Sequence, residues 1–231
     1  MERIKMQKWW WKILAIVMVL YSIAMGFLGN VPRLNILNET IRNLYFHVPL
    51  WFAMLVQMGI SWVFALMYLN GYKMKYDILS SRAAFVGGMF ALPGLITGSI
   101  WATFTWGKPW VAEDPKLQGV MAAMIVYFVY YLLRALIPDA QTKARISAVY
   151  NIFAFIMTFV FIMIYPRLAP NSLHPGNGGN PAFGKYDMDN MMRLVFYPAC
   201  MGWILMSIWL LNVLNRMKKL QYKLDNDEEV N

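Results

Sequence analysis

The two histidines of the chain are the residues with the clearest potential chemistry. His47 lies in RNLYFHVPLWF and His174 lies in RLAPNSLHPGNGG, and each has a proline within the next two residues. A neutral imidazole is a common metal ligand and a standard axial ligand of haem iron. A single loop histidine is more often only a solvated polar residue. The residues near the two histidines must therefore decide whether the pair indicates a binding site.

Three tryptophans lie between the histidines in the stretch WATFTWGKPWVAEDPKL, residues 101–117. An aromatic belt at a membrane surface is the ordinary explanation for such residues. The alternative is a binding platform, because indole faces stack on flat π-systems and bury large areas. Gly107 and Pro109 predict a bent, non-helical path for the tryptophans, which are Trp101, Trp106 and Trp110.

Haem and zinc are the two metal centres that these residues suggest. Zinc takes four ligands. It remains a candidate metal because the loops that carry these motifs also contain five carboxylates: Glu39, Glu113, Asp114, Asp187 and Asp189. Haem suits both residue types, since its iron has two axial positions and its ring is broad and apolar. Its propionates need cationic partners, and Arg42 and Lys116 are close in sequence. No C-x-x-C-H motif occurs, so haem would be held non-covalently and transiently, as haem b.

The elements that must position these residues are predicted to be membrane-spanning helices. The chain is 59% hydrophobic and only 14% charged, whereas soluble domains carry about 25% charged residues. Its apolar blocks approach the length of about 20 residues that spans a bilayer, and none alternates as a strand does. We therefore predict an all-α polytopic protein, one domain over residues 1–231 with six transmembrane helices in a bundle, at about 9–28, 48–69, 84–104, 118–137, 147–164 and 193–214.

The lysines and arginines predict how this bundle is oriented. Of 21 such residues, fourteen fall on the side that carries both termini, which places the termini and the tail 215–231 in the cytoplasm. The net charge of +9 then orients the chain in the membrane rather than binding nucleic acid. Three segments are then predicted to face outward. The segment 29–47 carries His47, 105–117 carries most of the tryptophan stretch, and 165–192 carries His174.

Five short motifs resemble those of a known family. TGSIW (97–101), WGKPW (106–110) and EDPKL (113–117) are similar to the tryptophan-rich signature of haem-handling membrane proteins of cytochrome c maturation. FHVP (46–49) and LHPG (173–176) resemble the two histidine motifs that flank this signature. Six spans and a short chain resemble the CcmC branch, whereas the related CcsA-type proteins are usually larger. The resemblance covers essentially the whole chain.

The resemblance implies a role for each residue of the motifs. His47 and His174 would be the axial ligands of haem iron, and Arg42, Asp114 and Lys116 match family positions near the haem. The platform shared by haem and its acceptor would comprise Trp101, Trp106, Gly107 and Trp110. The chain departs from the family pattern at 112–113, where Ala112 and Glu113 stand in the neighbourhood of a third tryptophan.

The resemblance also implies a function and a set of partners. The protein would bind haem at the periplasmic face of the bacterial inner membrane and deliver it to a CcmE-type haem chaperone. An ABC transporter and a small single-span subunit would complete its complex. This is transfer between binding sites rather than enzymatic catalysis. The alternative is a b-type membrane cytochrome in quinone-linked electron transfer; a transporter is disfavoured because the spans carry few polar residues.

Overall fold

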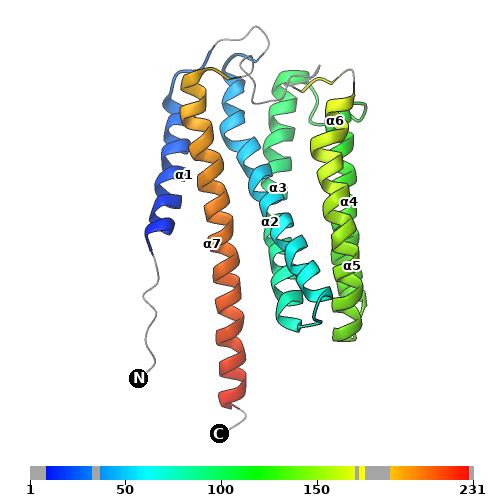
Figure 1. Ribbon diagram of the computed structural model, residues 1–231. Coiled ribbons are helices and arrows are strands. Elements are labelled where there is room, and N and C mark those ends of the chain that lie inside the picture. The colour runs from blue at the N-terminus through cyan, green and yellow to red at the C-terminus, as the bar shows by residue number, and fades with distance from the viewer. Residues whose placement is uncertain (1–8, 33–36, 170–171, 175–187, 229–231) are drawn as a thin grey trace.

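The computed structural model describes residues 9–32, 37–169, 172–174 and 188–228. These residues form a bundle of long helices that run alongside one another, without strands in the described ranges (Figure 1). The elements in chain order are α1 (Trp10–Leu28), the 3₁₀ helix η1 (Asn38–Asn43), α2 (Leu44–Leu69), α3 (Met74–Trp106), α4 (Pro115–Leu136), α5 (Ala140–Phe159), the π-helix η2 (Val160–Ile164), α6 (Tyr165–Leu168) and α7 (Asn190–Glu228).

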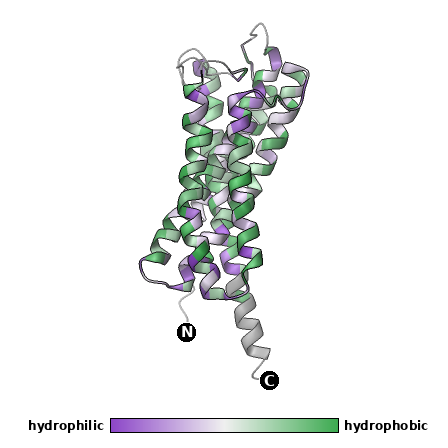
Figure 2. Cartoon of the chain, turned by 90° about the vertical axis from the view of Figure 1, so that its right-hand side faces the viewer, coloured by the Kyte–Doolittle hydropathy of each residue, from purple (hydrophilic) through white to green (hydrophobic). Residues whose placement is uncertain are grey.

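Six of these helical segments are long and apolar enough to cross a membrane, which confirms the predicted all-α polytopic membrane fold. α5, η2 and α6 are continuous and together make one of the six segments, Ala140–Leu168. The outer faces carry large exposed apolar side chains, such as Phe104 and Phe128. Hydrophobic residues cover the middle of the bundle and hydrophilic residues gather at its two ends (Figure 2), as the membrane core and its two polar surfaces require.

The helices extend beyond the predicted spans, and this changes the surroundings of the motifs. α2 begins at Leu44, so His47 lies inside a helix rather than in a loop. α3 continues through Trp106, so Trp101 and Trp106 are helical, in contrast to the bent path expected for them. Gly107 ends α3 with a φ of +74°, a left-handed conformation that glycine adopts without steric penalty. The tail predicted at 215–231 is helical as far as Glu228.

Glycines on one face of α3 bring α2 and its aromatic side chains close. A Cβ atom at Gly87 would lie 2.8 Å from Met58, and one at Gly94 would lie 3.2 Å from the ring of Trp51. Gly98 is tighter, since its Cβ would lie 2.6 Å from Cε1 of His47. Small residues at four-residue spacing allow such close helix approach in membranes. α3 therefore holds the N-terminal half of α2, including His47, at a fixed position.

Polar contacts join the helices at the opposite end of the bundle. Arg134 of α4 makes a bidentate pair with Asp77 of α3, with N–O distances of 2.6 and 2.9 Å. Asn151 of α5 donates to the Ser61 hydroxyl of α2 at 2.8 Å and to that of Ser80 of α3 at 3.1 Å. These buried side chains therefore satisfy one another across the helices.

Candidate functional site

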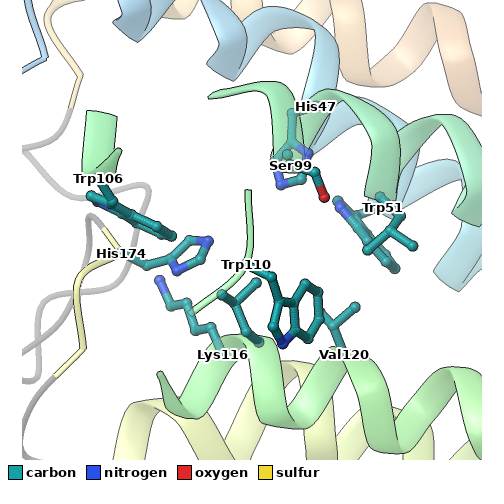
Figure 3. A pocket seen from close by; sticks show the side chains of 11 residues that line it. His47, Trp51, Ser99, Trp106, Trp110, Lys116, Val120 and His174 are labelled. Atoms are coloured by element: carbon teal, nitrogen blue, oxygen red, sulfur yellow. The ribbon is translucent and has the colours of Figure 1, made fainter. Parts of the chain in front are cut away.

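A pocket opens at the end of the bundle where α2 begins, α3 ends and α4 begins, and its empty space, counting the part that is open to solvent, is about 360 Å³. Both histidines line it, together with side chains from all three helices and from the α3–α4 connection (Figure 3). The lining residues are His47, Trp51, Leu95, Gly98, Ser99, Trp106, Trp110, Lys116, Leu117, Val120 and His174.

His47 presents one defined nitrogen for ligation. Its Nδ1 lies 2.8 Å from the carbonyl oxygen of Gly94 and 3.3 Å from Oγ1 of Thr97. A carbonyl oxygen can only accept, so Nδ1 carries the proton and donates it. The lone pair of Nε2 is then available to a metal, which is the arrangement that most metal-ligating histidines show.

His174 lies beside a carboxylate instead of a carbonyl. Its Nδ1 lies 3.3 Å from Oδ1 of Asp114, a close contact that is not aligned as a hydrogen bond. Its ring meets Trp106 edge-on at a centroid distance of 4.8 Å and Trp101 at 6.0 Å. Burial lowers the pKa of His174, although the approach of Asp114 opposes this shift. A lowered pKa favours the neutral imidazole, which is the form that binds metals.

Asp114 lies behind His174 and does not line the pocket. It caps α4, accepting from the backbone N–H groups of Lys116 at 2.9 Å and Leu117 at 3.3 Å. Its other oxygen accepts from the Ser172 hydroxyl at 2.8 Å and from the Leu173 N–H at 2.7 Å. Burial alone would raise the pKa of the Asp114 carboxyl, but the contacts from His174, Ser172 and Leu173 together hold it well below its usual range. Asp114 is therefore an anion beside His174 that lies outside the pocket lining.

The tryptophans of the predicted platform divide into two groups. Trp106 and Trp110 line the pocket, whereas Trp101 packs edge-on against Trp106 at 5.0 Å, outside the lining. Gly107 is outside the lining as well and provides the turn after α3.

Sequence reasoning missed Trp51, which lines the pocket beside His47 with their rings 6.1 Å apart. The sequence does indicate this position, because Trp51 follows His47 by four residues and residues four apart share one face of a helix.

The two predicted cationic partners have different surroundings. Lys116 lines the pocket. Arg42 is outside the lining: Nε pairs with Glu39 at 2.6 Å, and Nη1 donates to the carbonyls of Gly26 at 3.0 Å and Gly29 at 2.5 Å. These are carbonyls of the last turn and C-cap of α1, so Arg42 anchors the end of that helix.

The pocket brings two imidazole rings together with indole rings around one opening. In Figure 3, His47 stands with Trp51 on one side of the opening and His174 stands with Trp106 on another, with Trp110 and Lys116 below them. Within the described ranges, no group of three or more His, Cys, Asp or Glu side chains is placed to hold a metal ion. Of the carboxylates considered for zinc, Asp187 lies outside the described residues.

Comparisons with known proteins identify a family for the chain. The family model described as "CcmC: Heme exporter protein C" matches residues 1–229. "Heme exporter protein C" of Escherichia coli K12 is 27% identical over 214 residues, which is 91% of this chain and 82% of that protein. The protein of the same name from Bradyrhizobium diazoefficiens is 30% identical over 111 residues, 48% of this chain and 41% of that one. A "Putative cytochrome c biosynthesis ccmC-like mitochondrial protein" of Marchantia polymorpha is 32% identical over 93 residues, 40% of this chain and 39% of that one. The matches to the last two proteins thus span well under half of their lengths.

Proposed function

The chain belongs to the CcmC family, heme exporter protein C, and from that premise we propose that it binds haem non-covalently and hands it on during cytochrome c maturation. One observation carries the proposal: two histidines, with Nδ1 of His47 at 2.8 Å from the Gly94 carbonyl and Nδ1 of His174 at 3.3 Å from the Asp114 carboxylate, line one tryptophan-lined pocket. In both rings, Nε2 remains for the iron. The haem is cargo rather than a resident cofactor, so the protein acts as a carrier and not as an enzyme.

Each pocket residue makes a different contact with haem in this proposal. His47 and His174 bind the iron from its two axial sides through Nε2. Trp106 and Trp110 pack against the porphyrin, since indole and porphyrin are both flat π-systems. Lys116 pairs with a propionate as a point charge. Trp101 and Gly107 support this arrangement from outside the lining, and Arg42 stabilises α1.

The sidedness of the protein follows from its charges. The pocket end faces the periplasm and both termini face the cytoplasm, because positively charged residues concentrate on the cytoplasmic side of membrane proteins. In this orientation the acceptor is a periplasmic haem chaperone of the CcmE type. The further partners are ABC-transporter subunits and a small single-span subunit, all in the bacterial inner membrane.

A b-type cytochrome in quinone-linked electron transfer is the second candidate. The position of His47 inside α2 is compatible with it, since such proteins hold haem between helices. His174 lies on the described segment 172–174, which is not helical, and the pocket is at the end of the bundle. A carrier must release its haem, whereas a cytochrome keeps it, so haem release distinguishes the two.

The test follows haem from the purified, haem-loaded protein to a chaperone. The protein is mixed with an excess of apo-chaperone of the CcmE type, the two are separated, and the Soret absorbance of each fraction is measured. We expect the haem to move to the chaperone and the carrier to be recovered in its apo form. Haem that stays with this chain at every chaperone concentration would overturn the carrier function and favour the cytochrome. A chain that takes up no haem at all would overturn both.

A further inference from the structure

The three described residues 172–174 all contact one carboxylate, that of Asp114. Ser172 Oγ and Leu173 N donate to Oδ2 at 2.8 and 2.7 Å, and His174 Nδ1 lies 3.3 Å from Oδ1. Within the segment, His174 N donates to Ser172 Oγ at 3.1 Å. The position and the ring direction of His174 therefore both depend on Asp114.

Asp114 is itself fixed to the start of α4. Its Oδ1 accepts from the backbone N–H groups of Lys116 and Leu117, and the residue is only 3% exposed. Lys116 and Leu117 line the pocket, and so does Val120 one turn further along the helix. One buried carboxylate thus joins the α4 wall of the pocket to the segment that carries His174.

His47 has no comparable dependence on Asp114. It stands on α2, its Nδ1 donates to the neutral carbonyl of Gly94, and its ring fills the space left by Gly98. One imidazole is therefore held by a helix pair and a neutral acceptor. The other is held by an anion that also fixes its backbone.

We propose that Asp114 is the positioning residue for His174, holding its Nε2 toward the pocket and strengthening it as a ligand through the negative charge behind Nδ1. This inference rests on the proposed haem site, and it makes the two axial ligands unequal. A carboxylate behind a metal-bound imidazole fixes its orientation and raises its basicity. Removal of this support releases His174 from the iron and leaves His47 bound.

The experiment compares ligation of ferric haem in purified variants by absorption and electron paramagnetic resonance spectra. Asp114→Ala is expected to give a five-coordinate, high-spin haem whose spectrum matches that of His174→Ala, and added imidazole should restore the six-coordinate form. Asp114→Asn retains one side-chain acceptor oxygen for the α4 cap, the number that the cap uses, so the fold should persist. The affinity of that variant for haem should fall about 10- to 100-fold, the usual effect of changing such a partner.

Asp139→Ala is the matched control. Asp139 caps α5 by accepting from Thr142 N at 2.7 Å, and it has no role in the pocket. Its loss should lower the melting temperature as the loss of a helix cap does, while the haem stays six-coordinate. Ser172→Ala removes one contact to Asp114 without altering the α4 cap, and it should give a mixture of five- and six-coordinate haem. It decides the matter if Asp114→Ala does not fold.

Two results would overturn the inference. One is six-coordinate, parent-like haem in folded Asp114→Ala and in Ser172→Ala. The other is an Asp114→Ala spectrum that matches His47→Ala and differs from His174→Ala. Both leave the proposed function intact, provided that the two histidine variants change ligation. If neither histidine variant differs from the parent, the proposed site itself is wrong.

Discussion

At the scale of single residues, the pocket depends on the groups that contact the two histidines from outside the pocket. The Gly94 carbonyl fixes the tautomer of His47, and the missing side chain at Gly98 makes room for its ring. Asp114 fixes His174. Neither histidine motif contains its own support, which comes in both cases from another part of the chain.

Gly98→Ala tests the space that His47 occupies. A Cβ at this position would lie 2.6 Å from Cε1 of His47, so the ring must shift and its hydrogen bond to Gly94 must break. We expect haem affinity to fall by about tenfold or more, equivalent to about 1.4 kcal/mol, measured by titrating haem and following the Soret band. Gly71→Ala is the control, because a Cβ there meets nothing within 4 Å. Equal affinities for the two variants would show that His47 needs no such space.

Trp110→Ala tests the tryptophan platform. Removal of an aromatic contact to the porphyrin should weaken haem binding by up to about tenfold and leave the melting temperature of the haem-free protein almost unchanged. Trp10 is the control, since it is 64% exposed at the start of α1 and outside the pocket. If Trp110→Ala and Trp10→Ala bind haem equally well, Trp110 belongs to an aromatic belt instead.

At the scale of helices and loops, two basic residues near the histidine and tryptophan motifs serve different elements. Arg42 closes the C-terminal end of α1, whereas Lys116 stands in the first turn of α4 and lines the pocket. Their distances in sequence from the motifs did not distinguish them. The distinction arises because η1 directs Arg42 toward α1.

Arg42→Ala and Lys116→Ala should therefore change different properties, the first the stability of the protein and the second its affinity for haem. Arg42→Ala removes hydrogen bonds from a charged donor to two carbonyls, so it should reduce the free energy of unfolding by about 1–3 kcal/mol and leave haem affinity close to that of the parent. Lys116→Ala should weaken haem binding and change the melting temperature little. Both quantities are measured on detergent-purified protein. The assignment of Lys116 to a propionate fails if its variant binds haem as the parent does.

The sequence predicts the helices well where apolar runs are long, and less well where charged residues lie inside them. α3 begins ten residues before its predicted span, since the charge on Asp77 is compensated by Arg134 of α4, a pairing that depends on the tertiary structure. The helical state of Trp106 was missed because Gly107 ends the helix instead of bending it earlier. His47, His174, Trp106, Trp110 and Lys116 were found from residue type and order, and the structure brings them to one pocket. The roles of Asp114 and Arg42 needed the fold.

At the scale of the whole molecule, the bundle separates its two ends by chemistry. One end holds the pocket, and the helices toward the other end are joined by the Asp77–Arg134 pair and the hydrogen bonds of Asn151. α7 ends on the side opposite the pocket. A carrier of haem between membrane partners needs this polarity, because its site must be open on the side of the acceptor.

Labelling of introduced cysteines tests the orientation of the bundle. In a Cys200→Ser background, Glu113→Cys lies exposed at the pocket end and Gly71→Cys lies exposed at the other end. An impermeant maleimide added to whole cells, with the outer membrane permeabilised, should label position 113 and leave position 71 unlabelled until the cells are lysed. The reverse pattern would place the pocket in the cytoplasm.

The central claim is that His47 and His174 bind one iron between them, and the electron paramagnetic resonance spectrum of the ferric, haem-loaded protein tests it most directly. We expect a low-spin, bis-histidine signal in the parent and conversion to high spin in both His47→Ala and His174→Ala. A low-spin signal that survives either substitution unchanged would contradict it.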